Sequence, residues 1–145
     1  MTAVVRCARF GDLDVVTLYQ ILQLRVDVFV VEQACPYRDL DGRDREPATQ
    51  HLWIDDGEHV VACLRLLDDD REARIGRVVT APGHRRRGLA ALLLREAIAL
   101  AAPCPVVLDA QSHLVVWYGA FGFRVDGPEF LEDGIPHTPM RLTPS

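Results

Sequence analysis

Alternating hydrophobic and polar positions along the chain predict a series of short strands. Ala73–Thr80 alternates throughout, whereas residues 106–108 are wholly apolar, as expected of a strand that is buried on both faces. The run DDGE at 55–58 is typical of the tight turn of a hairpin. The other predicted strands are residues 4–10, 51–54, 59–67, 123–125 and 137–142.

Apolar residues at helical spacing predict three helices. The longest covers residues 15–31, where Asp12 or Asp14 can cap the first turn. Residues 88–100 are strong helix formers with little polar surface, so we expect this helix to be largely covered. Residues 113–121 predict a short third helix.

The order of these elements predicts one mixed α/β domain over residues 1–145. The passage from the strand at 73–80 through the helix at 88–100 to the strand at 106–108 indicates a parallel crossover. The polar segment from 32 to 50 is longer than most connections, which indicates a functional loop.

Composition and charge exclude several classes of protein. The chain has 145 residues, which suits one domain, and its net charge of −5 argues against nucleic-acid binding by bulk electrostatics. All 16 basic residues are arginines, which excludes Walker-type phosphate loops and lysine Schiff-base chemistry. The uncharged, mostly apolar stretch at residues 97–108 is too short to span a membrane.

Signals for export and for metal binding are missing from the sequence. The first residues lack the basic and long apolar regions of a secretory signal, so we expect a cytoplasmic location. The four cysteines are scattered without a Cys-x-x-Cys pair, which favours free thiols over a zinc site. We therefore expect no metal, no nucleic acid and no membrane among the partners.

The segment from residue 78 to residue 90 carries the most informative chemistry. A strand ends, a turn holds Arg85, Arg86 and Arg87, and a helix opens at Gly88 with small residues that allow close approach. The unpaired amides at a helix start bind anions, so this turn is suited to phosphate. The alternative is a surface turn with solvated arginines.

Two motifs carry a resemblance to a known superfamily. Arg85-x-x-Gly88-x-Ala90 resembles the Arg/Gln-x-x-Gly-x-Gly/Ala acetyl-CoA signature of the GNAT N-acetyltransferases. The run WYGAFGF at 117–123 resembles the aromatic-Tyr-x-x-x-Gly-Phe element that follows the fifth strand in that superfamily. The signature ends on Ala90 rather than glycine, a variation that the family pattern allows.

Further segments resemble one branch of the superfamily, the ElaA-type acetyltransferases. These segments are LQLR at 22–25, VFVVEQ at 28–33, CPY at 35–37, DLDG at 39–42 and EDGIPH at 132–137. The similarity therefore runs nearly from end to end.

The resemblance implies the GNAT acyl-CoA N-acyltransferase fold, an α/β (α+β) architecture. Its mixed, mostly antiparallel twisted sheet has six to seven strands and about four flanking helices, and parallel strands 4 and 5 splay apart to admit pantetheine. The backbone of Val78, Val79 and Thr80 would bind this arm, and the Val79 amide would stabilise the oxyanion. The pyrophosphate would rest on the turn formed by Arg85, Arg86, Arg87, Gly88, Leu89 and Ala90.

The implied activity is transfer of an acetyl group from acetyl-CoA to a primary amine by direct attack in a ternary complex. An amine of pKa about 10.4 gives up its proton at pH 7 at a cost of roughly 4.6 kcal/mol, which calls for a base. The alternative is a non-catalytic module that binds acyl-CoA or docks to a protein. The chain is expected to be a monomer or a homodimer.

Three residues are candidates for proton transfer. By resemblance Tyr118 is the acid that protonates the departing thiolate, and otherwise it is an ordinary core tyrosine. Glu32, at the end of the first long helix, is the first candidate for the base, and His51 and a water relay come next. The alternative for Glu32 is a helix-end carboxylate held by an arginine.

Two loops are candidates for binding the acceptor. Asp39, Asp41 and Asp44 form a carboxylate-rich loop that could attract a cationic amine, and a second loop with Asp133 and His137 is expected to meet it. The alternative is that these charges are only solvated and that the loop forms a turn at Asp41 and Gly42.

Overall fold

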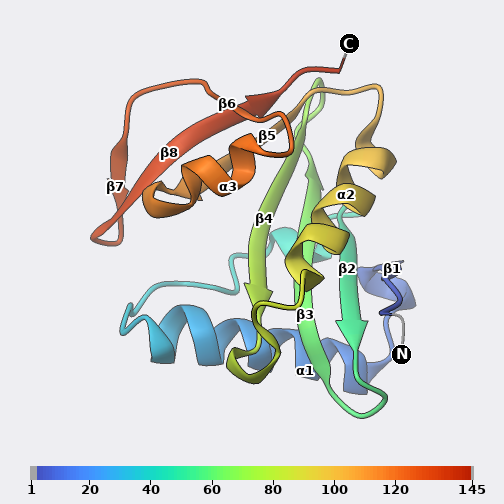
Figure 1. Ribbon diagram of the computed structural model, residues 1–145. Coiled ribbons are helices and arrows are strands. Elements are labelled where there is room, and N and C mark those ends of the chain that lie inside the picture. The colour runs from blue at the N-terminus through green and yellow to red at the C-terminus, as the bar shows by residue number, and fades with distance from the viewer. Residues whose placement is uncertain (1–2, 145) are drawn as a thin grey trace.

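The sheet of this protein is mixed, with one parallel pair among antiparallel neighbours. The computed structural model describes residues 3–144, whose eight strands follow the order β1-β2-β3-β4-β5-β8-β6, with β7 also paired to β8. The parallel pair is β4 and β5 (Figure 1). The strands are β1 (Arg6–Arg9), β2 (Gln50–Asp55), β3 (Val60–Asp68), β4 (Ala73–Thr80), β5 (Val106–Gln111), β6 (Arg124–Val125), β7 (Phe130–Glu132) and β8 (Ile135–Leu142).

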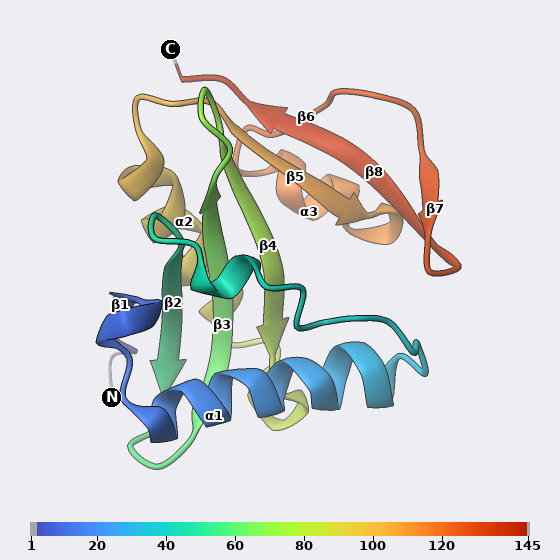
Figure 2. The ribbon, with the colours of Figure 1, turned by 180° about the vertical axis from the view of Figure 1, so that it is seen from behind.

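Helices cover both faces of the sheet. α1 and η2 lie on one face, and α2 and α3 lie on the opposite face, as the two views show (Figures 1 and 2). The helices are α1 (Val15–Arg25), the π-helix η2 (Val26–Glu32), α2 (Leu89–Ala101) and α3 (Val115–Gly119). Short 3-10 turns are η1 (Phe10–Asp12), η3 (Arg43–Arg45), η4 (Pro82–His84) and η5 (Ser112–Leu114).

Each face of the sheet has its own apolar core. On the α2 face, the fully buried Leu93 packs among sheet residues such as Leu64, and Tyr118 of α3 joins the same cluster. On the α1 face, Ile21 packs with Trp53. The two cores fix the helices on either side of the strands, because apolar area removed from water stabilises each contact.

The predicted helix over residues 15–31 is confirmed, and the structure divides it into two parts. Asp14 caps α1, since its side chain accepts a hydrogen bond from the Thr17 amide at 2.8 Å. From Val26 onward the backbone widens into the π-helix η2. π-Helical turns are rare in proteins, and those that occur are often at functional sites. The end of η2 carries Glu32 and Gln33 to the divergence of β4 and β5.

The splay of β4 and β5 is confirmed by their pairing. Ala73 pairs with Val106 and Arg74 pairs with Val107, and within residues 3–144 the two strands form no further pairs. Beyond these pairs the strands run apart (Figure 1). The facing edges of β4 and β5 therefore carry backbone groups that no neighbouring strand satisfies.

A bulge bends β4 at the point where it leaves β5. Cys63 of β3 pairs with Val79 of β4, and Arg65 pairs with Gly76. Between these two pairs, β4 contains one residue more than β3. Arg77 lies within this bulge and has a left-handed φ of 55°. The bulge therefore sets the direction of the Arg77 side chain.

The numbers of strands and helices differ from the sequence expectation. The sheet has eight strands rather than six to seven, because the three-residue edge strand β7 shows no alternation. Residues 3–144 contain three α-helices rather than about four. Pro36, Gly42 and Pro47 interrupt the segment after η2, where only the short turn η3 forms.

We expect Leu93→Ala to lower the free energy of unfolding by about 2–5 kcal/mol, because Leu93 is fully buried between α2 and the sheet and the substitution leaves a cavity. Urea denaturation of both proteins measures the difference. Leu92→Ala is the matched control, since Leu92 lies one position away and is 38% exposed. Equal destabilisation by the two substitutions would contradict the packing of α2.

Candidate active site

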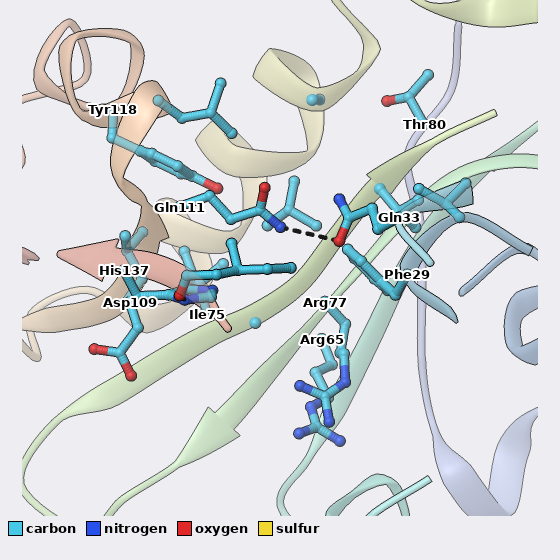
Figure 3. A pocket seen from close by; sticks show the side chains of 18 of the residues that line it. Phe29, Gln33, Arg65, Ile75, Arg77, Thr80, Asp109, Gln111, Tyr118 and His137 are labelled. Atoms are coloured by element: carbon cyan, nitrogen blue, oxygen red, sulfur yellow. Dashed lines mark hydrogen bonds between the residues drawn. The ribbon is translucent and has the colours of Figure 1, made fainter. Parts of the chain in front are cut away.

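A cavity of about 1110 Å³ occupies the gap between β4 and β5. Its walls come from both strands, from η2, from the turn before α2, from α3 and from the β7–β8 hairpin. Figure 3 shows side chains from these elements converging on it, with Phe29 and Gln33 of the η2 end facing Gln111 and Tyr118. The cavity therefore joins segments that are far apart in the sequence.

The turn before α2 forms one end of the cavity. Gly88, with a left-handed φ of 73°, is the N-cap of α2, and the first helical hydrogen bond runs from the Leu92 amide to the Gly88 carbonyl. The amides of Leu89 and Ala90 precede that bond and have no helical partner, which suits an anion. Arg85 and Arg86 line the cavity with Gly88, Leu89 and Ala90, whereas the exposed Arg87 is not among the lining residues.

The end of β4 provides the neighbouring wall. Val78, Val79 and Thr80 all line the cavity, and β3 pairs with one edge of this segment at Val79 and Thr80. The other edge faces the gap left by β5. Its amides and carbonyls can bond an extended ligand that carries amide groups of its own.

Glu32 is held by an arginine of the turn. Both of its carboxylate oxygens accept hydrogen bonds from Arg85, each at 2.8 Å, and the Arg85 Nε donates to the Thr80 carbonyl at 3.2 Å. The hydrogen bond from Arg85 lowers the pKa of Glu32 from its ordinary value. A carboxylate paired in this way is a weak base, and the structure has the paired arrangement that the sequence left as the alternative.

Tyr118 is a buried tyrosine that also lines the cavity. Its ring makes edge-on contacts with Trp117 at 4.9 Å and with Phe123 at 6.1 Å between centroids. Burial raises the pKa of Tyr118 to about 12, so the hydroxyl keeps its proton at neutral pH. The hydroxyl points to the interior of the cavity beside Gln111 (Figure 3).

A hydrogen bond between two glutamines crosses the cavity. The Gln111 side chain at the end of β5 donates to the Gln33 side chain after η2, at 3.3 Å (Figure 3). The sequence interpretation did not identify either residue as part of the site. Gln33 stood within the VFVVEQ segment, but no local pattern could pair it with a residue 78 positions away.

His51 lies outside the cavity. It is 1% exposed, is not among the lining residues, and its Nε2 lies 3.0 Å from the Asp44 carbonyl. A carbonyl only accepts, so Nε2 carries the proton of the neutral ring. Burial lowers the pKa of His51, and its contact with the Asp44 carbonyl makes it a support of the loop rather than a partner of the acceptor.

The carboxylates that were expected to attract a cationic amine are already paired. Arg25 bonds Asp39 at 3.0 Å and Asp44 at 2.7 Å, and Arg65 bonds Asp41 through two nitrogens at 2.8 and 2.6 Å. Asp39 and Asp44 are buried and only Asp41 lines the cavity. The arginines come from α1 and β3, so their proximity could not be inferred from the loop sequence.

Arg77 completes this charged cluster from the bulge in β4. Its Nε lies 2.9 Å from an Asp39 oxygen, and its guanidinium stacks 5.3 Å above the Tyr37 ring. The Tyr37 hydroxyl donates to Asp39 at 2.6 Å. Arg25, Arg65 and Arg77 thus balance Asp39, Asp41 and Asp44, and the cluster pins the loop that follows η2 against the sheet.

His137 is the one histidine of the predicted substrate loop, and the structure places it in the cavity wall. It stands on β8 directly opposite Gln111 of β5. Asp133, in the β7–β8 turn, lines the same wall. Of the predicted acceptor residues, His137, Asp133 and Asp41 therefore reach the cavity, while Asp39 is buried and does not line it.

Two further properties concern the described part of the chain. No helix among residues 3–144 is long and apolar enough to cross a membrane. Within the same residues, the His, Cys, Asp and Glu side chains do not form any group of three or more suited to a metal ion.

Comparison with known proteins places the chain among acyltransferases. Residues 18–144 match the family described as Acetyltransferase (GNAT) domain. A UPF0039 protein of Mycobacterium tuberculosis is 46% identical over 145 residues, covering 97% of this chain and 93% of that protein.

Solved structures agree with this match. The crystal structure of an acyl-CoA N-acyltransferase from Pseudomonas aeruginosa has a TM-score of 0.93 and 40% identity, covering 98% of this chain and all of that one. The crystal structure of ElaA from Escherichia coli has a TM-score of 0.91 and 36% identity, covering 97% of this chain and 99% of that one. The overall architecture is therefore that of acyl-CoA N-acyltransferases.

We expect Asp44→Asn to lower the free energy of unfolding by about 3–5 kcal/mol, because Asp44 pairs with both Arg25 and Arg65 and its loss leaves the buried cluster with one positive charge in excess. Burial opposes ionisation of Asp44, but the hydrogen bonds from Arg25 outweigh it, so the pKa of Asp44 is lowered. Its contribution is therefore present above an unfolded pKa of about 3.9 and is lost as the pH falls below that value.

Urea denaturation between pH 6 and pH 3 measures both effects. The wild type should lose stability over the lower part of this range, and Asp44→Asn should show a shallower dependence on pH. Asp12→Asn is the matched control, since Asp12 is exposed. Equal midpoints for Asp44→Asn and the wild type at pH 6 would show that this carboxylate is not part of a buried pair.

Proposed function

The chain belongs to the GNAT acetyltransferase family, and on this premise we propose that it transfers an acetyl group from acetyl-CoA to a primary amine. The observation that carries the proposal is the cavity, which runs from the amides at the start of α2 to the hydroxyl of Tyr118. The whole chain, residues 1–145, would act as one N-acetyltransferase domain. A cytoplasmic location is part of the same proposal.

The coenzyme would lie along the free edge of β4. Its pyrophosphate would bind the amides at the start of α2 together with Arg86, because Arg85 is engaged by Glu32. Its pantetheine amides would bond the backbone of Val78 to Thr80, replacing the strand partner that β5 does not provide. These contacts would be made by backbone groups, so the side chain at position 78 has little influence on coenzyme binding.

The thioester would then lie beneath Tyr118, where chemistry can occur without a covalent enzyme intermediate. The amine nitrogen attacks the thioester carbonyl, and the Val79 amide is suited to stabilise the oxyanion of the tetrahedral intermediate. The carbon–sulfur bond breaks as the carbonyl re-forms. Tyr118 keeps its proton at neutral pH and can donate it to the departing sulfur.

The acceptor would enter from the side of the cavity opposite to the turn before α2. This side is lined by the η2 end, by the loop that carries Asp41 and by the β7–β8 hairpin. Since Asp41 is bound by Arg65, simple attraction between loop carboxylates and a cationic amine does not select the acceptor. Shape and the polar groups of Gln33, Gln111 and His137 are the remaining determinants.

We expect acetyl-CoA to raise the melting temperature of the protein, because a ligand that binds only the folded state stabilises it by mass action. Ala90→Glu should abolish this shift, since it places a carboxylate where the pyrophosphate is proposed to bind. Ala99→Glu is the matched control, because Ala99 lies exposed on the same helix. A wild-type protein that acetyl-CoA and CoA fail to stabilise at saturation would overturn the proposal.

We expect Tyr118→Phe to lower kcat by about 10²-fold or more, because the leaving sulfur loses its proton donor. The thermal shift by acetyl-CoA should remain, since the phenyl ring preserves the packing of Tyr118 against Trp117. Release of free CoA thiol, measured with polyamines, amino acids, aminoglycosides and peptides, provides the rate. Tyr19→Phe, on exposed α1 surface, is the matched control.

Coenzyme binding combined with no thiol release across that panel, and no effect of Tyr118→Phe, would instead support a non-catalytic acyl-CoA-binding module.

A further inference from the structure

His137 has a ring whose two nitrogens have different partners. Nδ1 lies 2.8 Å from the backbone carbonyl oxygen of Ile135, the first residue of β8. A carbonyl oxygen only accepts hydrogen bonds, so Nδ1 must carry the ring proton. In the neutral imidazole Nε2 is then left with a lone pair that can accept a proton.

We propose that His137 is the general base that takes a proton from the acceptor amine at Nε2, an inference that rests on the acetyl transfer proposed above. The residue stands opposite Gln111 in the β5–β8 ladder, and Gln111 in turn lies beside the hydroxyl of Tyr118 in the cavity (Figure 3). The base and the acid therefore occupy one side of the site.

The surroundings of His137 hold the ring in place. The ring stacks on Phe130 with centroids 5.9 Å apart and an interplanar angle of 26°. Glu132 on β7 lies 3.9 Å from Nε2, where a carboxylate stabilises the imidazolium that forms after proton transfer. The His137 side chain is 13% exposed, so it is sheltered without being sealed from the cavity.

Two further carboxylates belong to the elements next to His137, one on β5 and one in the β7–β8 turn. Asp109, two residues before Gln111 on β5, is bound by Arg74 of β4 at 3.1 Å. Asp133 lies in the β7–β8 turn and lines the cavity.

The two bases suggested by the sequence are less suited to the task. Glu32 is engaged by Arg85 through both oxygens, so accepting a proton would break two charge-assisted hydrogen bonds. His51 is buried outside the cavity, and its Nε2 faces the Asp44 carbonyl. Of these three residues, His137 is the one that both lines the cavity and has a free proton acceptor. The contact of Nδ1 with the Ile135 carbonyl keeps Nε2 unprotonated in the neutral ring.

The proton balance of the step is complete with these groups. The ammonium gives one proton to Nε2 of His137, and the neutral nitrogen forms the new carbon–nitrogen bond with the thioester. As the carbon–sulfur bond breaks, Tyr118 passes its proton to the sulfur and recovers one from the nitrogen. The products are the acetamide, CoA thiol and one proton, which His137 releases to solvent.

The ring geometry can be tested without any acceptor. In the full-length protein labelled with ¹⁵N, long-range ¹H–¹⁵N correlation spectra distinguish protonated from unprotonated ring nitrogens, and His137→Gln identifies the signal that belongs to this residue. We expect a protonated Nδ1 and an unprotonated Nε2 when the ring is neutral. A protonated Nε2 would overturn the proposal whatever the activity of the enzyme.

The role in catalysis can be tested with the pH dependence of kcat for acetyl-CoA and the best amine of the panel. His137→Gln should lower kcat about 10²-fold at pH 7. The deficit should shrink as the pH rises toward an amine pKa of about 10.4, where the acceptor loses its proton unaided.

The controls separate this inference from the proposed function. His59→Gln carries the same change on an exposed hairpin turn and should leave the profile unchanged. If His137→Gln lowers kcat equally at every pH, or does not lower it, His137 is not the general base. The proposed acetyl transfer would remain valid in that case. A wild type that transfers acetyl to no amine overturns the proposed function, and the catalytic role of His137 with it.

Discussion

The parallel ladder between β4 and β5 ends after two residue pairs, Ala73 with Val106 and Arg74 with Val107, and the rest of the site depends on that early end. Beyond it, the facing strand edges carry donors and acceptors without strand partners, and buried polar groups of this kind are costly unless something satisfies them. A ligand with amide groups along an extended arm can provide the missing partners. The bulge at Arg77 strengthens the divergence, because it bends β4 where the pairing ends.

The charged cluster under the cavity explains why loop carboxylates do not define the acceptor. Arg25, Arg65 and Arg77 come from α1, β3 and β4, and they neutralise three aspartates of one loop. Removal of one member would leave a buried charge without a partner, which is costly. The cluster therefore holds the loop against both α1 and the sheet. The loop then forms a fixed wall of the acceptor side rather than a mobile patch of negative charge.

The groups proposed to bind the coenzyme and the groups proposed to move protons lie on different sides of the gap. The turn before α2 and the edge of β4 would supply backbone donors for the coenzyme. Tyr118 on α3 and His137 on β8 belong to the other side, beside Gln111 of β5. The proposed reaction therefore needs both halves of the split sheet, and the hydrogen bond between Gln33 and Gln111 spans the distance between them.

Much of this protein follows from its sequence, because strand alternation, helical spacing, caps and the contiguous run from Arg85 to Ala90 are local properties of the backbone. They were enough to predict seven of the strands, the three helices and the parallel crossover. Only the tertiary structure decided which side chains meet. Arg85 with Glu32, Arg25 with Asp44 and Gln33 with Gln111 are separated by 53, 19 and 78 positions. Such contacts depend on the twist of the sheet and on the divergence of β4 and β5, and the periodicity of the sequence does not determine that geometry.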